Sequence, residues 1–220
     1  MKIAVLGATG HIGRHVVSQA LGRGHEVVAY VRNPGAVERR AGLTVVQGSL
    51  DDQAAMADAF TGSDAVISCI GLRPPAKKPV DLMQRTLPLI TSAAKEAGAQ
   101  RFVLVSAFGV AETAAKGSLL ARSIFSTIVA SIFRDKALSE QILPAIGFNW
   151  TTVYPVNLKE GKNGPKAVVK PLDQVGKIPE LPTLTFATTA STLLDIAAND
   201  AMSGRRVFIT TEKGWKPVAG

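Results

Sequence analysis

The chain has 220 residues, 46% of them hydrophobic, and a mean hydropathy of +0.19, so it can bury a core and is not a disordered chain. Its formal charge of +8 indicates a solvated basic surface or attraction for an anionic small molecule. The charges are dispersed and no recognition motif accompanies them, which argues against nucleic acid. The single Cys69 excludes an internal disulfide and is typical of the reducing cytoplasm, and three scattered histidines offer no metal-ligand spacing. We therefore expect a cytoplasmic protein without a metal.

Strands and helices are expected to alternate along the chain. Apolar runs predict strands at 2–6, 27–31, 44–47, 65–70, 102–106, 150–154 and 206–210. Helical periodicity predicts helices at 12–22, 53–60, 82–97, 119–143 (intact or broken) and 190–199. This alternation predicts an α/β protein, a Rossmann-type doubly wound parallel sheet in a single domain, 1–220. Residues 155–189 are rich in proline and glycine and predict a small irregular C-terminal lobe.

The turn after the first strand carries the strongest functional signal. Gly7, Gly10 and Gly13 follow an apolar run and lead into a helical pattern, which is the context of a dinucleotide-binding turn. Gly7 would allow the tight turn, Gly10 the approach of the pyrophosphate, and Gly13 the close packing of helix and strand. The helix N-terminus would face the phosphates. We assign six turn residues to the cofactor, namely Gly7, Thr9, Gly10, His11, Ile12 and Gly13.

The Gly-x-x-Gly-x-x-Gly spacing resembles that of the short-chain dehydrogenase/reductase superfamily. The resemblance is closer to its atypical branch, which includes the NmrA-like proteins and the biliverdin-IXβ (flavin) reductases. Two later segments share it: 134–143 is similar to the lysine helix of the family, and 147–155 to the strand that follows. The resemblance implies an NAD(P)H-binding site, with the substrate pocket built by the lobe at 155–189.

The end of the second strand indicates which dinucleotide binds. An NAD-preferring site usually carries a carboxylate there, whereas this chain has Arg32 and Asn33. Arg32 is placed to bind a 2′-phosphate, as in the NADPH-using members of the family, with Arg14 and Arg39 as possible helpers. A solvated strand-end arginine is the alternative. We predict NADP(H) as the cofactor.

Three further strand ends complete the expected cofactor site. In the segment 48–51, which resembles the adenine-side segment of the family, Leu50 would cover the adenine and Ser49 would bond its amine. Asp51 is expected only to cap the next helix. Ile70 and Gly71 would approach the nicotinamide ribose, and Cys69 is expected to be a core residue. The cofactor set is completed by Ser106, Lys136, Tyr154 and Pro155.

Two segments leave alternatives open. The proline-rich basic loop at 73–81 is either a cover of the site or a surface connection. The apolar segment 117–133 is interrupted by Arg122 and is shorter than the roughly 20 residues that span a bilayer. We expect it to form a core or pocket-wall helix, or to be buried against a second subunit. The chain is therefore expected to be a monomer or homodimer that does not insert into a membrane.

The candidate catalytic residues are Ser106, Lys136 and Tyr154. Many short-chain reductases use Tyr-x-x-x-Lys, but Ile132 stands four residues before Lys136, so the proton-donating tyrosine is absent. Ser106 lies at the family's serine position and would donate a hydrogen bond where charge develops. Lys136 would bond the ribose, or pair with Asp135 or Glu140 on the surface. Tyr154 is either a proton donor or a structural residue.

Two functions fit this pattern. The first is an NADPH-dependent reductase that passes hydride to a planar conjugated small molecule, such as a flavin, a quinone or a biliverdin-like compound, which can delocalise charge without a strong acid. The second is a non-catalytic NADP(H)-binding redox sensor of the NmrA type. Loss of the tyrosine favours both.

Overall fold

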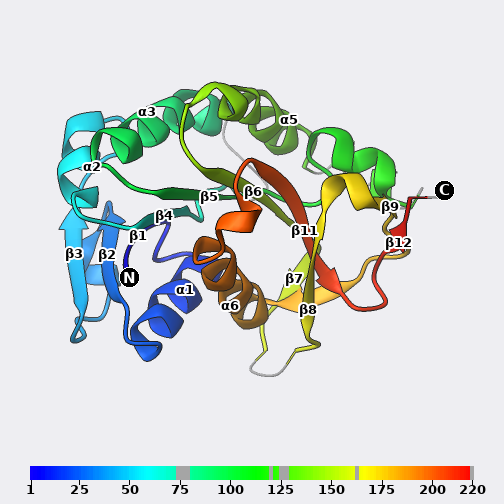
Figure 1. The fold of residues 1–220 in the computed structure, drawn as a ribbon, viewed down its shortest axis with the longest axis horizontal. Coiled ribbons are helices and arrows are strands. Elements are labelled where there is room, and N and C mark those ends of the chain that lie inside the picture. Colours follow the sequence, from blue (N-terminus) through cyan, green and yellow to red (C-terminus); the bar gives the residue numbers. More distant parts are fainter. Residues whose placement is uncertain (73–79, 119–120, 124–128, 162–163, 219–220) are drawn as a thin grey trace.

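The computed structural model describes residues 1–72, 80–118, 121–123, 129–161 and 164–218. Its centre is an eight-stranded sheet in the order β3-β2-β1-β4-β5-β6-β11-β8, which confirms the predicted α/β fold (Figure 1). The strands are β1 (Lys2–Leu6), β2 (Glu26–Val31), β3 (Leu43–Gln47), β4 (Ala65–Ser68), β5 (Arg101–Val105), β6 (Trp150–Pro155), β8 (Ala167–Pro171) and β11 (Arg205–Thr211). All pairings are parallel except that of β8 with β11. The order reverses between β1 and β4, and in such sheets ligands bind beyond the carboxyl ends of the strands at this point.

Helices cover both faces of the sheet, as the strand–helix alternation predicts. One face carries α1 (His11–Gly22) and α6 (Phe186–Ala197), and the other carries α2 (Gln53–Phe60), α3 (Leu82–Glu96) and α5 (Ala130–Ser139) (Figure 1). Because side chains alternate along a strand, β1 contributes to two cores. Ile3 and Val5 pack on the α1–α6 side, while Ala4 and Leu6 pack on the α2–α3 side.

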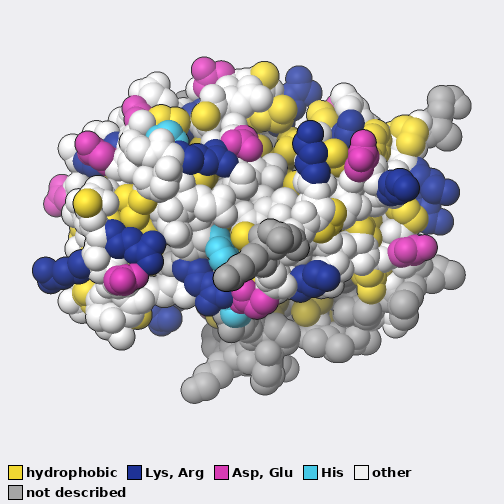
Figure 2. Space-filling model, turned by 90° about the horizontal axis from the view of Figure 1, so that it is seen from below, with side chains coloured by type: hydrophobic (Ala, Val, Ile, Leu, Met, Phe, Trp, Pro, Cys, Tyr) yellow, Lys and Arg dark blue, Asp and Glu magenta, His cyan; other side chains and the backbone are white. Residues whose placement is uncertain are grey.

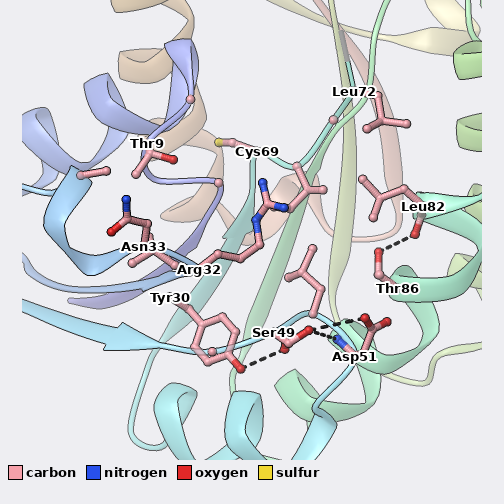
Figure 3. Close-up of a pocket in the computed structure, with 18 of the residues that line it drawn as sticks. Thr9, Tyr30, Arg32, Asn33, Ser49, Asp51, Cys69, Leu72, Leu82 and Thr86 are labelled. Carbon is pink, nitrogen blue, oxygen red and sulfur yellow. Dashed lines mark hydrogen bonds between the residues drawn. The ribbon is translucent and has the colours of Figure 1, made fainter. Parts of the chain in front are cut away.

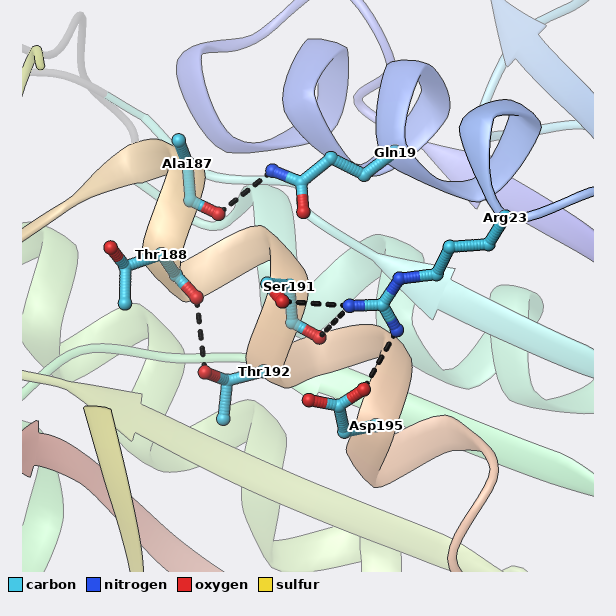
Figure 4. A network of polar contacts seen from close by, with 7 residues as sticks. All are labelled: Gln19, Arg23, Ala187, Thr188, Ser191, Thr192 and Asp195. Atoms are coloured by element: carbon cyan, nitrogen blue, oxygen red, sulfur yellow. Dashed lines mark hydrogen bonds and ion pairs between the residues drawn. The ribbon is translucent and has the colours of Figure 1, made fainter. Parts of the chain in front are cut away.

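Polar contacts hold α6 against α1 (Figure 4). The Gln19 side-chain amide donates to the Ala187 carbonyl at 2.8 Å. The Arg23 guanidinium lies 2.7 Å from both the Asp195 carboxylate and the Ser191 hydroxyl. The helix that begins at the glycine turn is thereby tied to the helix that follows the C-terminal lobe.

The lobe at 155–189 contains more regular structure than the sequence predicts. It includes β7 (Asn157–Lys159), β8, β9 (Val175–Lys177) and β10 (Thr183–Thr185). β7 pairs with β10, β9 pairs with β12 (Lys216–Pro217), and β8 extends the central sheet. These strands have two to five residues, too few for a periodic pattern to stand out.

For the region 119–143 the sequence predicts an intact or a broken helix. Residues 121–123 are helical, α5 spans Ala130–Ser139, and a 3₁₀ turn continues over Glu140–Ala145. Pro144 lies in that turn, and proline does not continue a regular α-helix. Further 3₁₀ turns span Pro34–Ala36, Ala111–Lys116, Leu172–Gln174 and Asp200–Met202. Most of the 73–81 loop and the middle of the 117–133 segment lie outside the described residues.

The described residues on the face that carries α1 and α6 form no single basic patch. Lys and Arg side chains lie there in separate groups with acidic side chains among them (Figure 2). Across the described part of the chain, no helix combines the length and apolarity needed to cross a membrane.

Candidate functional site

The glycine turn has the geometry that the sequence predicts. Gly7 has φ of +72°, a left-handed conformation that favours glycine. A Cβ on Gly13 would lie 2.1 Å from the Gly7 carbonyl oxygen, so only glycine lets α1 approach β1 this closely. Gly10 donates to that carbonyl at 2.9 Å and is the N-cap of α1. No side chain of the described residues caps the helix, so its first N–H groups are left for an anion.

A cavity of about 430 Å³ lies beside this turn, at the carboxyl ends of β1, β2, β3 and β4 (Figure 3). Nine of the predicted cofactor residues line it: Gly7, Thr9, Gly10, Arg32, Asn33, Ser49, Leu50, Ile70 and Gly71. The lining also contains residues that the sequence did not single out, including Tyr30, Leu82, Arg85 and Thr86. The residues chosen because they follow the strands therefore form one wall of the cavity, whereas residues of α3 form the other.

Arg32 extends from the end of β2 into the cavity (Figure 3). Among the described residues, its guanidinium has no hydrogen-bond or ion-pair partner, while Asn33 accepts a bond from the Gly35 amide. Among the described residues that line the cavity, Asp51 is the one with a carboxylate, and it forms an ion pair with Arg85 of α3. Arg32 thus presents an unpaired positive charge to a ligand.

The adenine end of the expected site is ordered by Tyr30. Its hydroxyl donates to the Ser49 carbonyl at 3.0 Å. A Cβ on Gly48 would lie 2.0 Å from the Tyr30 hydroxyl oxygen, which explains the glycine before Ser49. Asp52, rather than Asp51, caps α2 by accepting from the Ala55 amide at 3.0 Å. Asp51 is free to hold Arg85 because the capping position is one residue later than expected.

Lys136 is buried beside the cavity, and it is not one of the lining residues, nor are Ser106 and Tyr154. Its ammonium donates to the Val105 carbonyl at 3.0 Å and to the Ile70 carbonyl at 3.4 Å, which joins the ends of β5 and β4. It is not a surface residue paired with an acid, because burial leaves it 7% exposed and no ion pair to it occurs among the described residues. Burial lowers the pKa of Lys136. Burial raises the pKa of the neighbouring Cys69 thiol to about 12, which keeps the thiol protonated near neutral pH.

Ser106 and Tyr154 meet at Glu140, which the sequence did not place in the site. The Ser106 hydroxyl donates to one Glu140 oxygen, and the Tyr154 hydroxyl donates to the other at 2.7 Å. All three side chains are buried. Burial and the Glu140 carboxylate raise the pKa of Tyr154 far above its ordinary range. Pro155, next along β6, is buried, does not line the cavity, and accepts a bond from the Phe108 amide.

Asp135, next to Lys136 on α5, binds the start of α3. Its carboxylate accepts hydrogen bonds from the Met83 amide at 2.9 Å and the Gln84 amide at 3.0 Å, at the start of α3. The residue that precedes α3, Asp81, makes no capping bond. The cavity wall formed by α3 is therefore held in place by α5.

The remaining turn residues face the lobe or the core. His11 stacks on Phe186, with ring centroids 4.8 Å apart, and its Nδ1 lies 3.0 Å from the Glu160 carboxylate. Glu160 also pairs with Arg14. Ile12 packs against the core under α1. The lobe thus contacts the start of α1, which is where the phosphates of a dinucleotide would bind.

These features fit a dinucleotide. Gly7 and Gly13 keep the cradle free of Cβ atoms, the N-terminus of α1 is uncapped, and Arg32 is unpaired among the described residues. No cluster of His, Cys, Asp or Glu suited to a metal ion occurs in the same described residues. A family model described as NAD(P)H-binding matches residues 7–200.

The chain belongs to this NAD(P)H-binding family. The match begins at the first glycine of the turn and continues through α6. It confirms the resemblance to NAD(P)H-binding proteins and the expectation that the cofactor is NAD(P)H.

Relatives of the chain include reductases. An isoflavone reductase homologue from Zea mays is 39% identical over 80 residues, which cover 32% of this chain and 26% of that protein. The chain spans 26–36% of the length of this relative and of three other plant proteins.

Among solved structures, SP1627 of Streptococcus pneumoniae, provisionally named an NADH-flavin reductase, has a TM-score of 0.76 and 25% identity over 96% of this chain and 100% of that chain. ChuY, an anaerobillin reductase from Escherichia coli O157:H7, has a TM-score of 0.78 and 20% identity over 97% and 98% of the two chains.

Proposed function

We propose that this protein is a reductase that uses NADPH to pass hydride to a planar conjugated acceptor, such as a flavin, a quinone or a linear tetrapyrrole. The observation that carries the cofactor preference is Arg32, which extends into the cavity without a partner among the described residues. Its guanidinium suits the 2′-phosphate that distinguishes NADPH from NADH. The bound cofactor supplies the hydride, and this chain supplies binding and orientation.

The arrangement around Ser106 supports an acceptor that needs little acid catalysis. The tyrosine expected before Lys136 in an ordinary carbonyl reductase is Ile132, and the Tyr154 hydroxyl is bonded to Glu140 inside the fold. A conjugated acceptor spreads the incoming negative charge over its rings and can take its proton from solvent. The names of the similar reductases from S. pneumoniae and E. coli agree with this class of substrate.

Binding titrations test the cofactor preference. NADPH and NADH are titrated into wild-type protein, Arg32→Ala, and Arg205→Ala, which removes the same charge at the start of β11. We expect Arg32→Ala to lose about 10- to 100-fold in NADPH affinity and little in NADH affinity, since a charge-assisted hydrogen bond contributes about 1.5–3 kcal/mol. Arg205→Ala should match wild type. Equal binding of the two dinucleotides by wild type would refute the preference.

A non-catalytic sensor is the second candidate, and one observation favours it. Both candidate donor hydroxyls, those of Ser106 and Tyr154, are bonded to Glu140 and so are not presented to a substrate. NADPH oxidation with FMN, menadione and biliverdin separates the two functions. Steady turnover supports the reductase. Tight NADPH binding without turnover on any acceptor supports the sensor.

A further inference from the structure

Glu140 joins two hydroxyl groups inside the fold. Its carboxyl group is 2% exposed, while Ser106 is 6% exposed and Tyr154 is fully buried. One carboxyl oxygen accepts from Ser106 and the other from Tyr154. The three residues come from the 3₁₀ turn after α5, the end of β5 and β6, and they are brought together only by the fold.

Ser106 occupies the position from which this cluster can reach a substrate. It follows Val105, whose carbonyl shares the Lys136 ammonium with the Ile70 carbonyl. Ile70 lines the cavity, so Ser106 lies at the adjoining strand end. Ser106 is slightly more exposed than Glu140 and Tyr154.

The protonation state of Glu140 determines what Ser106 can offer. An ionised carboxylate only accepts hydrogen bonds, so it holds the protons of both hydroxyls and leaves Ser106 with lone pairs alone. A protonated carboxyl group has one proton to donate, and one of the two hydroxyls must accept it. That hydroxyl can then direct its own proton elsewhere.

Ser106 is the hydroxyl that turns. The Tyr154 hydroxyl has Glu140 as its one hydrogen-bond partner among the described residues, so turning away would leave its proton unpaired in the core. The Ser106 hydroxyl rotates about a single bond, and Ser106 lies at the end of β5, next to the strand end that lines the cavity. Protonation of Glu140 therefore converts Ser106 from an acceptor into a donor toward the cavity.

Several charges surround Glu140. Lys136 and Asp135 lie on α5, Arg206 lies on β11, and Glu112 pairs with Arg206 at 2.8 Å. Burial raises the pKa of Glu140. This effect outweighs the lowering of the pKa by the two hydroxyl groups and by the positive charges of Lys136 and Arg206. The protonated form thus persists to higher pH than for an ordinary glutamate.

We propose that Glu140 is a positioning residue that makes Ser106 a hydrogen-bond donor to the reduced acceptor only while Glu140 carries its proton. This inference rests on the proposed reductase function. It predicts a preference for acceptors that develop negative charge on an oxygen or nitrogen near Ser106.

Glu140→Gln is the informative variant. A glutamine amide can donate to Ser106 and accept from Tyr154, which copies the protonated carboxyl group at every pH. The kcat/KM for NADPH-dependent FMN reduction in wild type should fall about tenfold per pH unit above the pKa of Glu140, toward the level of Ser106→Ala. In Glu140→Gln the profile should lose this fall, and its rate should exceed that of wild type at high pH. Ser106→Ala should be slow and flat.

Glu112→Gln is the matched control, because it removes a nearby carboxylate that bonds Arg206 rather than Ser106. Its profile should keep the wild-type fall. A wild-type fall that persists in Glu140→Gln, or that survives in Ser106→Ala, would overturn the proposal.

Infrared spectroscopy provides a readout that does not require turnover. The carbonyl band of a protonated carboxyl group should be present in wild type, absent in Glu140→Gln, and shifted in Ser106→Ala because the acid loses its acceptor. The band should vanish as pH rises. If no variant turns over but the band behaves in this way, the reductase fails and the Glu140–Ser106 coupling stands. Absence of the band, or a band unaffected by Ser106→Ala, would refute the coupling itself.

Discussion

Gly13→Ala perturbs the contact on which the cofactor cradle depends. A Cβ at Gly13 would lie 2.1 Å from the Gly7 carbonyl oxygen and 2.9 Å from the Ala8 Cα, and both are backbone atoms. Restoring a 3.4 Å contact from 2.1 Å requires α1 and the turn to separate by about 1.3 Å. Overpacking of this kind costs up to about 3 kcal/mol, from which about 1 kcal/mol is offset by the better helix propensity of alanine. We expect a net loss of about 2 kcal/mol in the free energy of unfolding.

The same shift moves the N-terminus of α1 away from the phosphates. NADPH affinity should fall about tenfold to a hundredfold, since misplacement of a positioned group by about 1 Å has effects of this order. Denaturant unfolding and isothermal titration with NADPH measure the two losses.

Gly22→Ala is the control in the same helix, because a Cβ there meets no atom within 4 Å. It should bind NADPH like wild type and gain up to about 1 kcal/mol in stability. Wild-type affinity and stability in Gly13→Ala would refute the packing argument.

Three further results are expected. Asp135→Ala should lower the free energy of unfolding by about 2–4 kcal/mol, because it leaves the Met83 and Gln84 amides at the start of α3 without their acceptor. Loss of the exposed Asp195 carboxylate should cost less than about 1 kcal/mol, and equal losses for the two variants in denaturant unfolding would contradict this. At about pH 8, iodoacetamide should modify native Cys69 about 1,000-fold more slowly than the unfolded chain, because its pKa is near 12, and equal rates would refute the shift. The raised pKa of Glu140 means that the folded state holds its proton to higher pH than the unfolded state does. As pH rises above the ordinary range of a glutamate, wild-type stability should therefore decline relative to Glu140→Gln, by about 1.4 kcal/mol per unit of pKa elevation, and a difference that stays constant with pH would exclude the shift.

The sequence predicts those parts of the site whose causes are local. Gly7 and Gly13 are required by a turn and a close approach within one βα unit, and Arg32 follows directly from the end of β2. The parallel direction of most strands follows from their alternation with helices. Each of these inferences needs only neighbouring residues.

The polar cluster could not be predicted in the same way. Glu140 is separated by 34 residues from Ser106 and by 14 from Tyr154, and no spacing rule relates the three. The sequence-based alternatives for Lys136 included a surface ion pair because a lysine between acids on a helix is usually solvated. Its burial depends on how α5 packs over β4 and β5. Asp135 illustrates the same limit, since it accepts a hydrogen bond from the Met83 amide, 52 residues earlier in the chain.

The antiparallel pairing of β8 with β11 has a consequence for motion. It runs from Val207 opposite Pro171 to Thr211 opposite Ala167, so a full ladder joins the C-terminal lobe to the central sheet. A hinge that swung the lobe outward as one body would have to break those backbone bonds together. A substrate would instead enter through rearrangements of connecting segments and side chains, while the strands β8 and β11 stay paired. A new substrate specificity would then be engineered by changing side chains on a backbone that stays in place. A lobe taken from another protein would need a strand that can pair with β11 over the same length as β8.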